Sequence, residues 1–305
     1  MYMFTKKIII VFSFLLISMS YSKVFAQQQI YSYSQYADNL TAINPAYSVL
    51  DKAGSVSVLG RKQFIGIDGA PSSVMVNANF PIESINGAAG LYVLNDQAAI
   101  EHQVEVNAFF AKSIQLTESD YLAVSLNAGV RNYVGNYSQL DASDPQFMND
   151  VRETKPNIGF GVMLYSANYY LGLSVPELTI RSLGNASEQQ ANYLRTHYYF
   201  TGAYLADVSD DVKFKPATLV SYVRGSSVLA NVSGTLYLKE QLGVGLNYRT
   251  DKKAAAMLSV IGKAFKVGYS YQFGTSSNNL GGVNITTHEV SISYRFGNVT
   301  GSKLL

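Results

Sequence analysis

The segment Glu289-Val290-Ser291-Ile292-Ser293-Tyr294-Arg295-Phe296 alternates between polar and apolar side chains without interruption. Residues 265–273, with the sequence FKVGYSYQF, show the same alternation one segment earlier in the chain. Successive side chains of a β-strand point to opposite faces, so each segment predicts a sheet with one apolar and one polar surface. In a soluble sandwich the apolar surface forms the core. In an outer-membrane barrel it faces lipid, and the polar surface lines the lumen.

The N-terminal residues 1–26 have the features of a cleavable signal peptide. Two lysines precede an apolar run over residues 8–17, and Val24 and Ala26 occupy the positions that a signal peptidase reads. The run is shorter than the roughly 20 apolar residues of a membrane-spanning helix. We therefore expect cleavage before Gln27 and export of the chain, with no cysteine there to carry a lipid anchor.

The composition favours a membrane barrel and argues against a nucleic-acid partner. Hydrophobic residues make up 48% and charged residues 14% of the chain, whereas soluble domains usually carry about 25% charged residues. The 23 tyrosines suit a membrane interface, where the ring sits among lipids and the hydroxyl stays hydrated. Without the three lysines of the signal peptide, the 23 basic residues fall to 20 against 21 acidic ones. A net charge near −1 gives no general surface for nucleic acid.

Residues 51–305 are predicted to form an all-β, antiparallel outer-membrane barrel of about fourteen strands, an even number as in bacterial single-chain barrels. The strand candidates are residues 54–61, 73–80, 87–94, 103–111, 121–134, 157–165, 169–175, 195–206, 212–224, 228–239, 241–249, 254–261, 265–273 and 288–296. Residues 27–50 precede them as a polar, tyrosine-rich lead-in. We expect this lead-in to be a short N-terminal periplasmic segment, with a short helix around residues 35–40 that ends at Asn44-Pro45.

The lengths of the connections support the barrel over a soluble sandwich. The three longest, over residues 135–156, 176–194 and 274–287, are the fifth, seventh and thirteenth in the predicted order, all odd. Outer-membrane barrels carry long loops outside and short turns in the periplasm. With the N-terminus in the periplasm, the odd connections fall outside, and a sandwich has no reason to sort its loops in this way.

The sequence predicts no catalytic residues and no metal site. Its three histidines are His102, His197 and His288. A hydrolase would need a serine and a histidine within hydrogen-bond reach and a third group that orients the histidine, and no nucleophile motif lies near any of the three. The acidic residues within 141–153 are spaced too irregularly for a calcium loop. We therefore expect a protein that is not an enzyme and has no cofactor.

The alternation also predicts which charged side chains face the lumen. The lumen-lining candidates are Arg131, Lys213, Lys215, Lys239, Arg249, Lys266 and Arg295, against the acidic Glu105 and Glu289. A lumen lined mostly by cations would attract an anionic solute or an acidic protein segment. Alternatively, carboxylates of the outer loops or of the lead-in fold inward and pair with these cations. The lead-in then either plugs the lumen or hangs below it.

A series of short motifs, in order along nearly the whole mature chain, resembles the PorP/SprF family of the Bacteroidota type IX secretion and gliding machinery. The motifs are Gln35-Tyr36, Asn44-Pro45-Ala46-Tyr47, Arg61, Gln63-Phe64, Ile67-Asp68-Gly69-Ala70-Pro71-Ser72, Gly90-Leu91-Tyr92, Asn95-Asp96, Gly159-Phe160-Gly161-Val162, Gly243-Val244-Gly245-Leu246-Asn247-Tyr248-Arg249 and His288-Glu289-Val290. Each motif alone is weak, and their order and spacing carry the resemblance.

The resemblance implies a non-enzymatic outer-membrane protein that helps to secrete a cargo or to hold it at the surface. Its expected partners are the type-B C-terminal domain of a secreted surface protein or adhesin, the periplasmic type IX secretion components and outer-membrane lipid. The residues that carry the motifs and are candidates for partner contacts are Asn44, Pro45, Arg61, Asp68, Gly69, Pro71, Asn95, Asp96, His288 and Glu289. The alternative function is a channel or transporter for small or hydrophobic solutes.

Overall fold

The computed structural model describes residues 33–140, 149–179, 196–223, 226–275 and 286–297. In these residues it contains fifteen strands and four short 3₁₀ helices. The strands are β1 (Gly54–Gln63), β2 (Ser72–Ile82), β3 (Gly87–Ala98), β4 (Glu101–Gln115), β5 (Tyr121–Gly135), β6 (Val151–Tyr165), β7 (Tyr169–Thr179), β8 (His197–Tyr204), β9 (Ala206–Ser209), β10 (Val212–Val223), β11 (Leu229–Leu238), β12 (Leu242–Arg249), β13 (Lys253–Ile261), β14 (Phe265–Gly274) and β15 (Thr287–Phe296). The helices are η1 (Tyr36–Asp38), η2 (Pro45–Val49), η3 (Glu83–Ile85) and η4 (Tyr137–Gln139). None of the described helices is long and apolar enough to cross a membrane.

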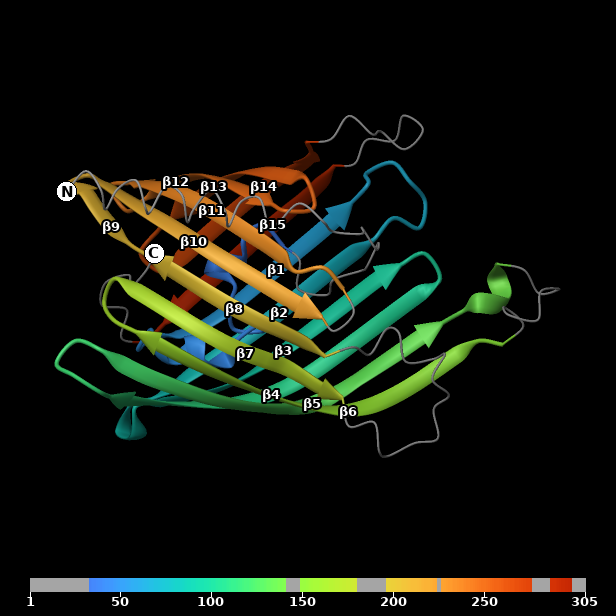
Figure 1. Ribbon diagram of the computed structural model, residues 1–305, viewed down its shortest axis with the longest axis horizontal. Coiled ribbons are helices and arrows are strands. Elements are labelled where there is room, and N and C mark those ends of the chain that lie inside the picture. The colour runs from blue at the N-terminus through green and yellow to red at the C-terminus, as the bar shows by residue number, and fades with distance from the viewer. Residues whose placement is uncertain (1–32, 141–148, 180–195, 224–225, 276–285, 298–305) are drawn as a thin grey trace, which may run out of the picture.

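The strands form one closed antiparallel barrel (Figure 1). Each pairs with its neighbours in sequence, β10 pairs with both β8 and β11, and β15 returns to β1 in a register that joins Gly54 to Phe296. The short β9 pairs only with the end of β10, so fourteen strands close the wall. This confirms the fold predicted from the alternating pattern. In the described part of the chain, closure leaves the fourteen wall strands without an open sheet edge, which is what a sheet needs in hydrocarbon.

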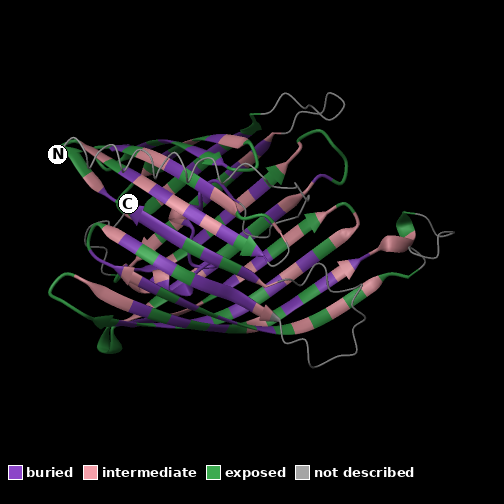
Figure 2. Ribbon diagram, in the orientation of Figure 1, coloured by how far each residue is buried: buried purple, intermediate pink, exposed green. Residues whose placement is uncertain are grey.

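Exposed and buried residues alternate along the strands (Figure 2), and most of the exposed ones are apolar. On β15, Val290 and Ile292 are 47% and 49% exposed, whereas the adjacent Glu289 is 0% exposed. A soluble protein buries its apolar face, so this arrangement is inverted. The outer surface is apolar and the interior polar, as in an outer-membrane barrel.

The long connections lie at one end of the barrel. They join β5 to β6, β7 to β8 and β14 to β15, and antiparallel pairing places all three at the end where β1 finishes. We call this the loop end. The opposite end, where β1 begins and β15 finishes, carries only short connections such as residues 166–168 and 262–264, and we call it the turn end.

Several strands extend further toward the loop end than their apolar patterns predicted. β6 begins at Val151, so residues 151–156 belong to the wall, where they pair with β5. Glu153 of the predicted acidic loop therefore lies in a strand, 2.9 Å from Lys155, while residues 141–148 lie outside the described chain. Polar residues continue these strands because the wall extends beyond the apolar band, where side chains meet water and not lipid.

The described part of the lead-in lies inside the barrel and not below it (Figure 1). Its apolar side chains pack against inward-facing residues of the wall. The resulting core includes Tyr36, Leu40, Ile43 and Ala46 from the lead-in, with Met75, Tyr92, Met163 and Tyr170 from the strands. We call residues 33–50 the plug; residues 27–32 are outside the described chain.

The local structure of the plug differs from the predicted helix. Residues 35–40 contain only the three-residue η1, and Asn44-Pro45 begins the second helix, η2, where it was expected to end the first. The side chain of Asn44 accepts a hydrogen bond from the backbone of Ala46 at 3.1 Å. Asparagine is a preferred N-cap, and proline is favoured at the first position because its missing N–H has no partner there anyway.

Candidate functional site in the barrel lumen

Asn44 fixes the plug to β6 and β7. Its side chain is fully buried, and Nδ2 donates to the carbonyl oxygens of Val162 at 3.2 Å and Leu173 at 3.4 Å. Next to it, Ser174 Oγ donates to the carbonyl oxygen of Ile43 at 2.7 Å. A Cβ atom added at Gly161 would lie 2.1 Å from Asn44 Oδ1. The glycine thus lets the plug approach the wall more closely than any other residue allows.

Asp38 joins the plug to two lysines of the wall. Its carboxylate lies 3.2 Å from Lys215 Nζ on β10 and 2.8 Å from Lys266 Nζ on β14. Lys215 also donates to the carbonyl oxygen of Ala37 at 3.3 Å. Burial alone would raise the pKa of Asp38, but the charges of Lys266 and Lys215 outweigh it and hold the pKa below its ordinary value. The plug therefore supplies the carboxylate that neutralises these two lumen lysines.

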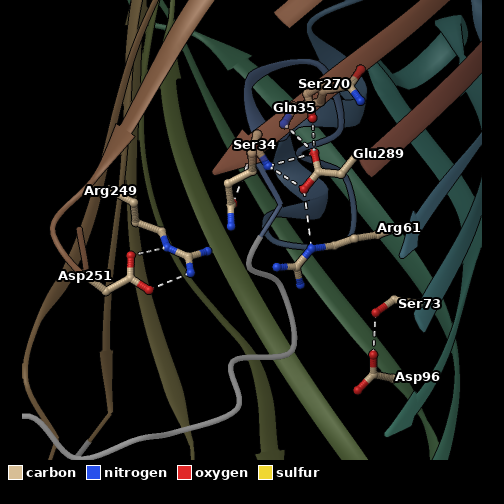
Figure 3. A network of polar contacts seen from close by, with 10 residues as sticks. Ser34, Gln35, Arg61, Ser73, Asp96, Arg249, Asp251, Ser270 and Glu289 are labelled. Carbon is tan, nitrogen blue, oxygen red and sulfur yellow. Dashed lines mark hydrogen bonds and ion pairs between the residues drawn. The ribbon is translucent and has the colours of Figure 1, made fainter. Parts of the chain in front are cut away.

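Glu289 on β15 binds the start of the plug (Figure 3). Its carboxylate accepts hydrogen bonds from the backbone N–H groups of Ser34 at 2.9 Å and Gln35 at 3.3 Å. Ser270 Oγ donates to the same carboxylate at 2.8 Å. Arg61 Nε of β1 approaches it to 3.4 Å. A fully buried carboxylate is costly unless it is hydrogen-bonded and paired, and here the plug backbone supplies part of what it needs.

Arg131 on β5 lies between two buried carboxylates of the wall. Its guanidinium contacts Glu105 Oε2 at 3.0 Å and also pairs with Glu177 on β7. Asn157 Nδ2 donates to Glu105 at 3.0 Å. Sequence reasoning missed Glu177, because the predicted strand ended at Val175. Strict alternation would not have found it, because Tyr170, Gly172 and Ser174 face the lumen and residue 177 would then face outward. An irregularity in the pairing of β7 with β6, between Val175 and Leu178, turns Glu177 inward.

Two further ion pairs lie at the ends of the barrel. Arg249 on β12 binds Asp251 through two contacts of 2.6 Å near the loop end. Burial would raise the pKa of Asp251, but hydrogen bonding and charge from Arg249, with Lys253, lower it. Near the turn end, Arg295 pairs with Asp51, just after the plug.

The lumen-lining candidates therefore divide by depth. Arg131, Lys215 and Arg249 are buried, Lys213, Lys266 and Arg295 are half-buried, and Lys239 is exposed. The prediction for Lys239 was wrong: β11 ends at Leu238, and Lys239 lies in the turn with a φ of 49°. Lys213 pairs with Asp207 at 3.3 Å and Glu240 at 2.8 Å, at the turn end.

The residues of the family motifs fall into three places and form no single site. Asn44 and Pro45 are in the plug, whereas Arg61, Glu289 and Asp96 face the lumen, the last as an acceptor from Ser73 Oγ. Two outward-facing pairs lie nearer the loop end on the barrel surface: Asn95 with His102 at 2.7 Å, and His288 with Tyr269 at 2.7 Å. Asp68, Gly69 and Pro71 are in the connection from β1 to β2, where Asp68 and Gly69 are exposed and Gly69 has a φ of 72°.

The described residues contain no group of three or more histidine, cysteine, aspartate or glutamate side chains placed to hold a metal ion. The buried carboxylates named above are already engaged by cations or backbone donors. The chemistry that this lumen supports is therefore pairing of charges and hydrogen bonding between wall and plug.

A closed barrel of fourteen antiparallel strands with an apolar outer surface and a polar interior defines an outer-membrane β-barrel protein. The model of one protein family, the type IX secretion system membrane proteins PorP/SprF, matches residues 25–294. The chain belongs to this family. No curated protein sequence matches it significantly.

Solved structures align with this chain at low sequence identity. The toluene transporter TodX of Pseudomonas putida aligns with a TM-score of 0.50 and 10% identity over 90% of this chain and 99% of that chain. The outer-membrane protein Omp33 of Acinetobacter baumannii aligns with a TM-score of 0.46 and 10% identity, over 80% of this chain and 99% of that chain. At such identities the likeness concerns the fold alone.

Proposed function

We propose that this barrel is a membrane-fixed support for a secreted surface protein, which it holds through a type-B C-terminal domain at the cell surface. Membership of the type IX secretion family over nearly the whole chain supports a role in this pathway. The observation that carries the proposal is the plug. A lumen filled by the chain's own buried residues 33–50 suits a support better than an open passage.

The two ends of the barrel then have different partners. Long connections lie outside in outer-membrane barrels, so the loop end faces the cell exterior and the turn end faces the periplasm. Asp68 and Gly69, exposed in the connection from β1 to β2, belong to the surface available to the secreted partner. The short connections of the turn end belong to the surface available to the periplasmic secretion components.

Affinity recovery of the tagged barrel from detergent-solubilised outer membranes, read by mass spectrometry, tests this proposal. We expect one large surface protein, captured through its C-terminal domain, together with secretion components. The matched comparison is a barrel with Asp68→Ala and Pro71→Ala against one with Asp210→Ala, since residue 210 is also exposed but lies at the turn end. Loss of the surface protein only in the first variant supports the assignment of the ends.

The alternative function, a channel for small or hydrophobic solutes, makes an opposite prediction. An open lumen passes ions in a planar lipid bilayer, and a plugged one does not. A barrel that is recovered without any partner and conducts ions steadily would favour the channel function over the support. The hydrogen bonds and ion pairs that join the plug to β6, β7, β10, β14 and β15 predict the closed result.

A further inference from the structure

Arg61 is a buried charge that the lumen leaves incompletely paired. It is 8% exposed, and its contact in the described part of the chain is the single approach of 3.4 Å from Nε to Glu289 Oε1. That Nε makes no hydrogen bond. Its two terminal guanidinium nitrogens have no hydrogen bond to a described residue either, and they are not among the fully buried atoms. Glu289 is meanwhile engaged by three other donors, Ser34 N, Gln35 N and Ser270 Oγ.

The guanidinium of Arg61 is expected to bind an anionic partner. A guanidinium carries five N–H donors and no acceptor, and it stays charged in proteins. Removal of this charge from water is unfavourable unless a counter-charge and hydrogen bonds replace the water. The planar fork of the terminal nitrogens matches a carboxylate, which it can bind through two parallel hydrogen bonds. The partner is thus expected on the side of Arg61 that faces away from Glu289.

That side lies in the loop-end half of the lumen. Arg61 lies two residues before the end of β1, and Figure 3 shows its side chain pointing toward Arg249 from across the barrel. Arg249 is already held by Asp251 at 2.6 Å, and Asp96 accepts from Ser73. Lys253 also pairs with Asp251 and lies close enough to Arg61 to interact with its charge. Arg249 and Lys253 therefore balance Asp251 and Asp96, so the site suits one additional negative charge better than a multivalent anion.

We propose that Arg61 is the centre of a carboxylate-binding site in the loop-end half of the lumen, and that its ligand is a single carboxylate of a peptide segment entering from the loop end. The identity of the peptide as part of the secreted partner rests on the proposed function. The chemistry of the site does not. The carboxylate comes either from the C-terminus of the partner chain or from an aspartate or glutamate side chain.

The first experiment needs no partner. Purified barrel in detergent is heated with sodium acetate or with sodium chloride at equal ionic strength, and the temperature is recorded at which the folded electrophoretic band converts to the unfolded one. A ligand that binds only the folded state raises this temperature. We expect acetate to raise it for the wild-type protein and for Lys62→Gln, but not for Arg61→Gln.

Lys62→Gln is the matched control, because Lys62 is the next residue on β1, carries the same charge and is exposed on the opposite face. An equal effect of acetate and chloride on the wild-type protein overturns the proposal. An acetate effect that survives in Arg61→Gln overturns it as well. Arg61→Lys keeps the charge without the fork, so it should respond less than the wild-type protein.

The second experiment identifies the source of the carboxylate. At equal amounts of folded barrel, we expect Arg61→Gln to lower recovery of the surface partner about tenfold or more, the effect of losing a hydrogen bond to a charged group. A short Gly-Ser extension of the partner's C-terminus lowers recovery if the terminal carboxylate is the ligand. Substitution of its acidic side chains by amides does so if a side chain is. Failure of the wild-type barrel to recover any partner refutes the proposed function, while the acetate result still decides the site.

Discussion

Asp38 shows at the scale of one residue how the plug and the wall depend on each other. Its carboxylate pairs with Lys215, whose side chain is 1% exposed, and with the half-buried Lys266. A buried ion pair contributes little net stability compared with apolar residues of similar volume, but removal of one partner leaves an uncompensated charge. Without the plug, the wall would therefore hold two lysines in the lumen that lack this counter-charge.

Asp38→Asn tests this dependence. Loss of the carboxylate leaves two lysines in the lumen without their counter-charge, so we expect a loss of stability of about 3 kcal/mol. The measurement is the conversion temperature of the folded band, with Asp210→Asn as the control, because Asp210 is exposed in the turn between β9 and β10. If the two variants have the same conversion temperature, the charge of Asp38 does not hold the plug in place.

Acid should weaken the same contact. The pKa of Asp38 is lowered in the folded protein, so its contribution to stability is fully present above the unfolded value of about 3.9. It is lost as the pH falls through the lower, folded value. We expect the conversion temperature of the wild-type protein to fall below about pH 4, and to fall less in Asp38→Asn. A parallel fall in both proteins would assign the acid sensitivity to other carboxylates.

At the scale of the element, adjacent residues of β15 lie on opposite faces of the wall. Ile292 is 49% exposed on the apolar surface, whereas Ser293 faces inward, opposite Lys266 of β14. We expect Ile292→Asp to hinder assembly, since a charge on the lipid face costs at most about 2–4 kcal/mol at the bilayer midplane. Ser293→Asp should be tolerated. Comparison of the two variants by the yield of folded band checks the register, and equal yields would contradict it.

The strands were predictable because a wall between lipid and a polar lumen imposes a two-residue period that survives in the sequence. All fourteen wall strands have a counterpart among the predicted segments. Strand ends were less predictable, since beyond the apolar band no lipid selects the outward side chain. The exposed Lys239 shows this limit: parity assigned it inward, but β11 ends one residue earlier in a tight turn.

The position of the plug could not be predicted from the pattern. Residues 33–50 have no strand or helix period, because they pack by shape against a wall that encloses them on all sides. Tyr36, Leu40 and Ile43 are buried without belonging to a regular face. Cationic lumen residues gave the partial signal, since Lys215 and Lys266 required a carboxylate. The sequence did not say that Asp38 supplies it.

At the scale of the whole molecule, the question is whether the plug must move for the barrel to hold a partner. The contacts of the plug extend from Asn79, which donates to the carbonyl oxygen of Ser48 at 3.0 Å near the turn end, to Glu289 near the loop end. It therefore spans most of the lumen and is anchored along its length. A support needs no transit through the lumen, so we expect the barrel to hold its partner with the plug fixed.

A covalent lock tests this expectation. The chain has no cysteine, so Gln35→Cys with Ser291→Cys places a unique pair where the native side chains meet at 2.8 Å. After cross-linking with a short bismaleimide, we expect wild-type recovery of the surface partner and no ion conductance in a planar bilayer, with each single variant as a control. Lost recovery in the cross-linked barrel alone would show that the plug leaves its seat during function. The lumen would then be a passage that opens when the plug is displaced, and the ion pairs of Asp38 would hold it closed.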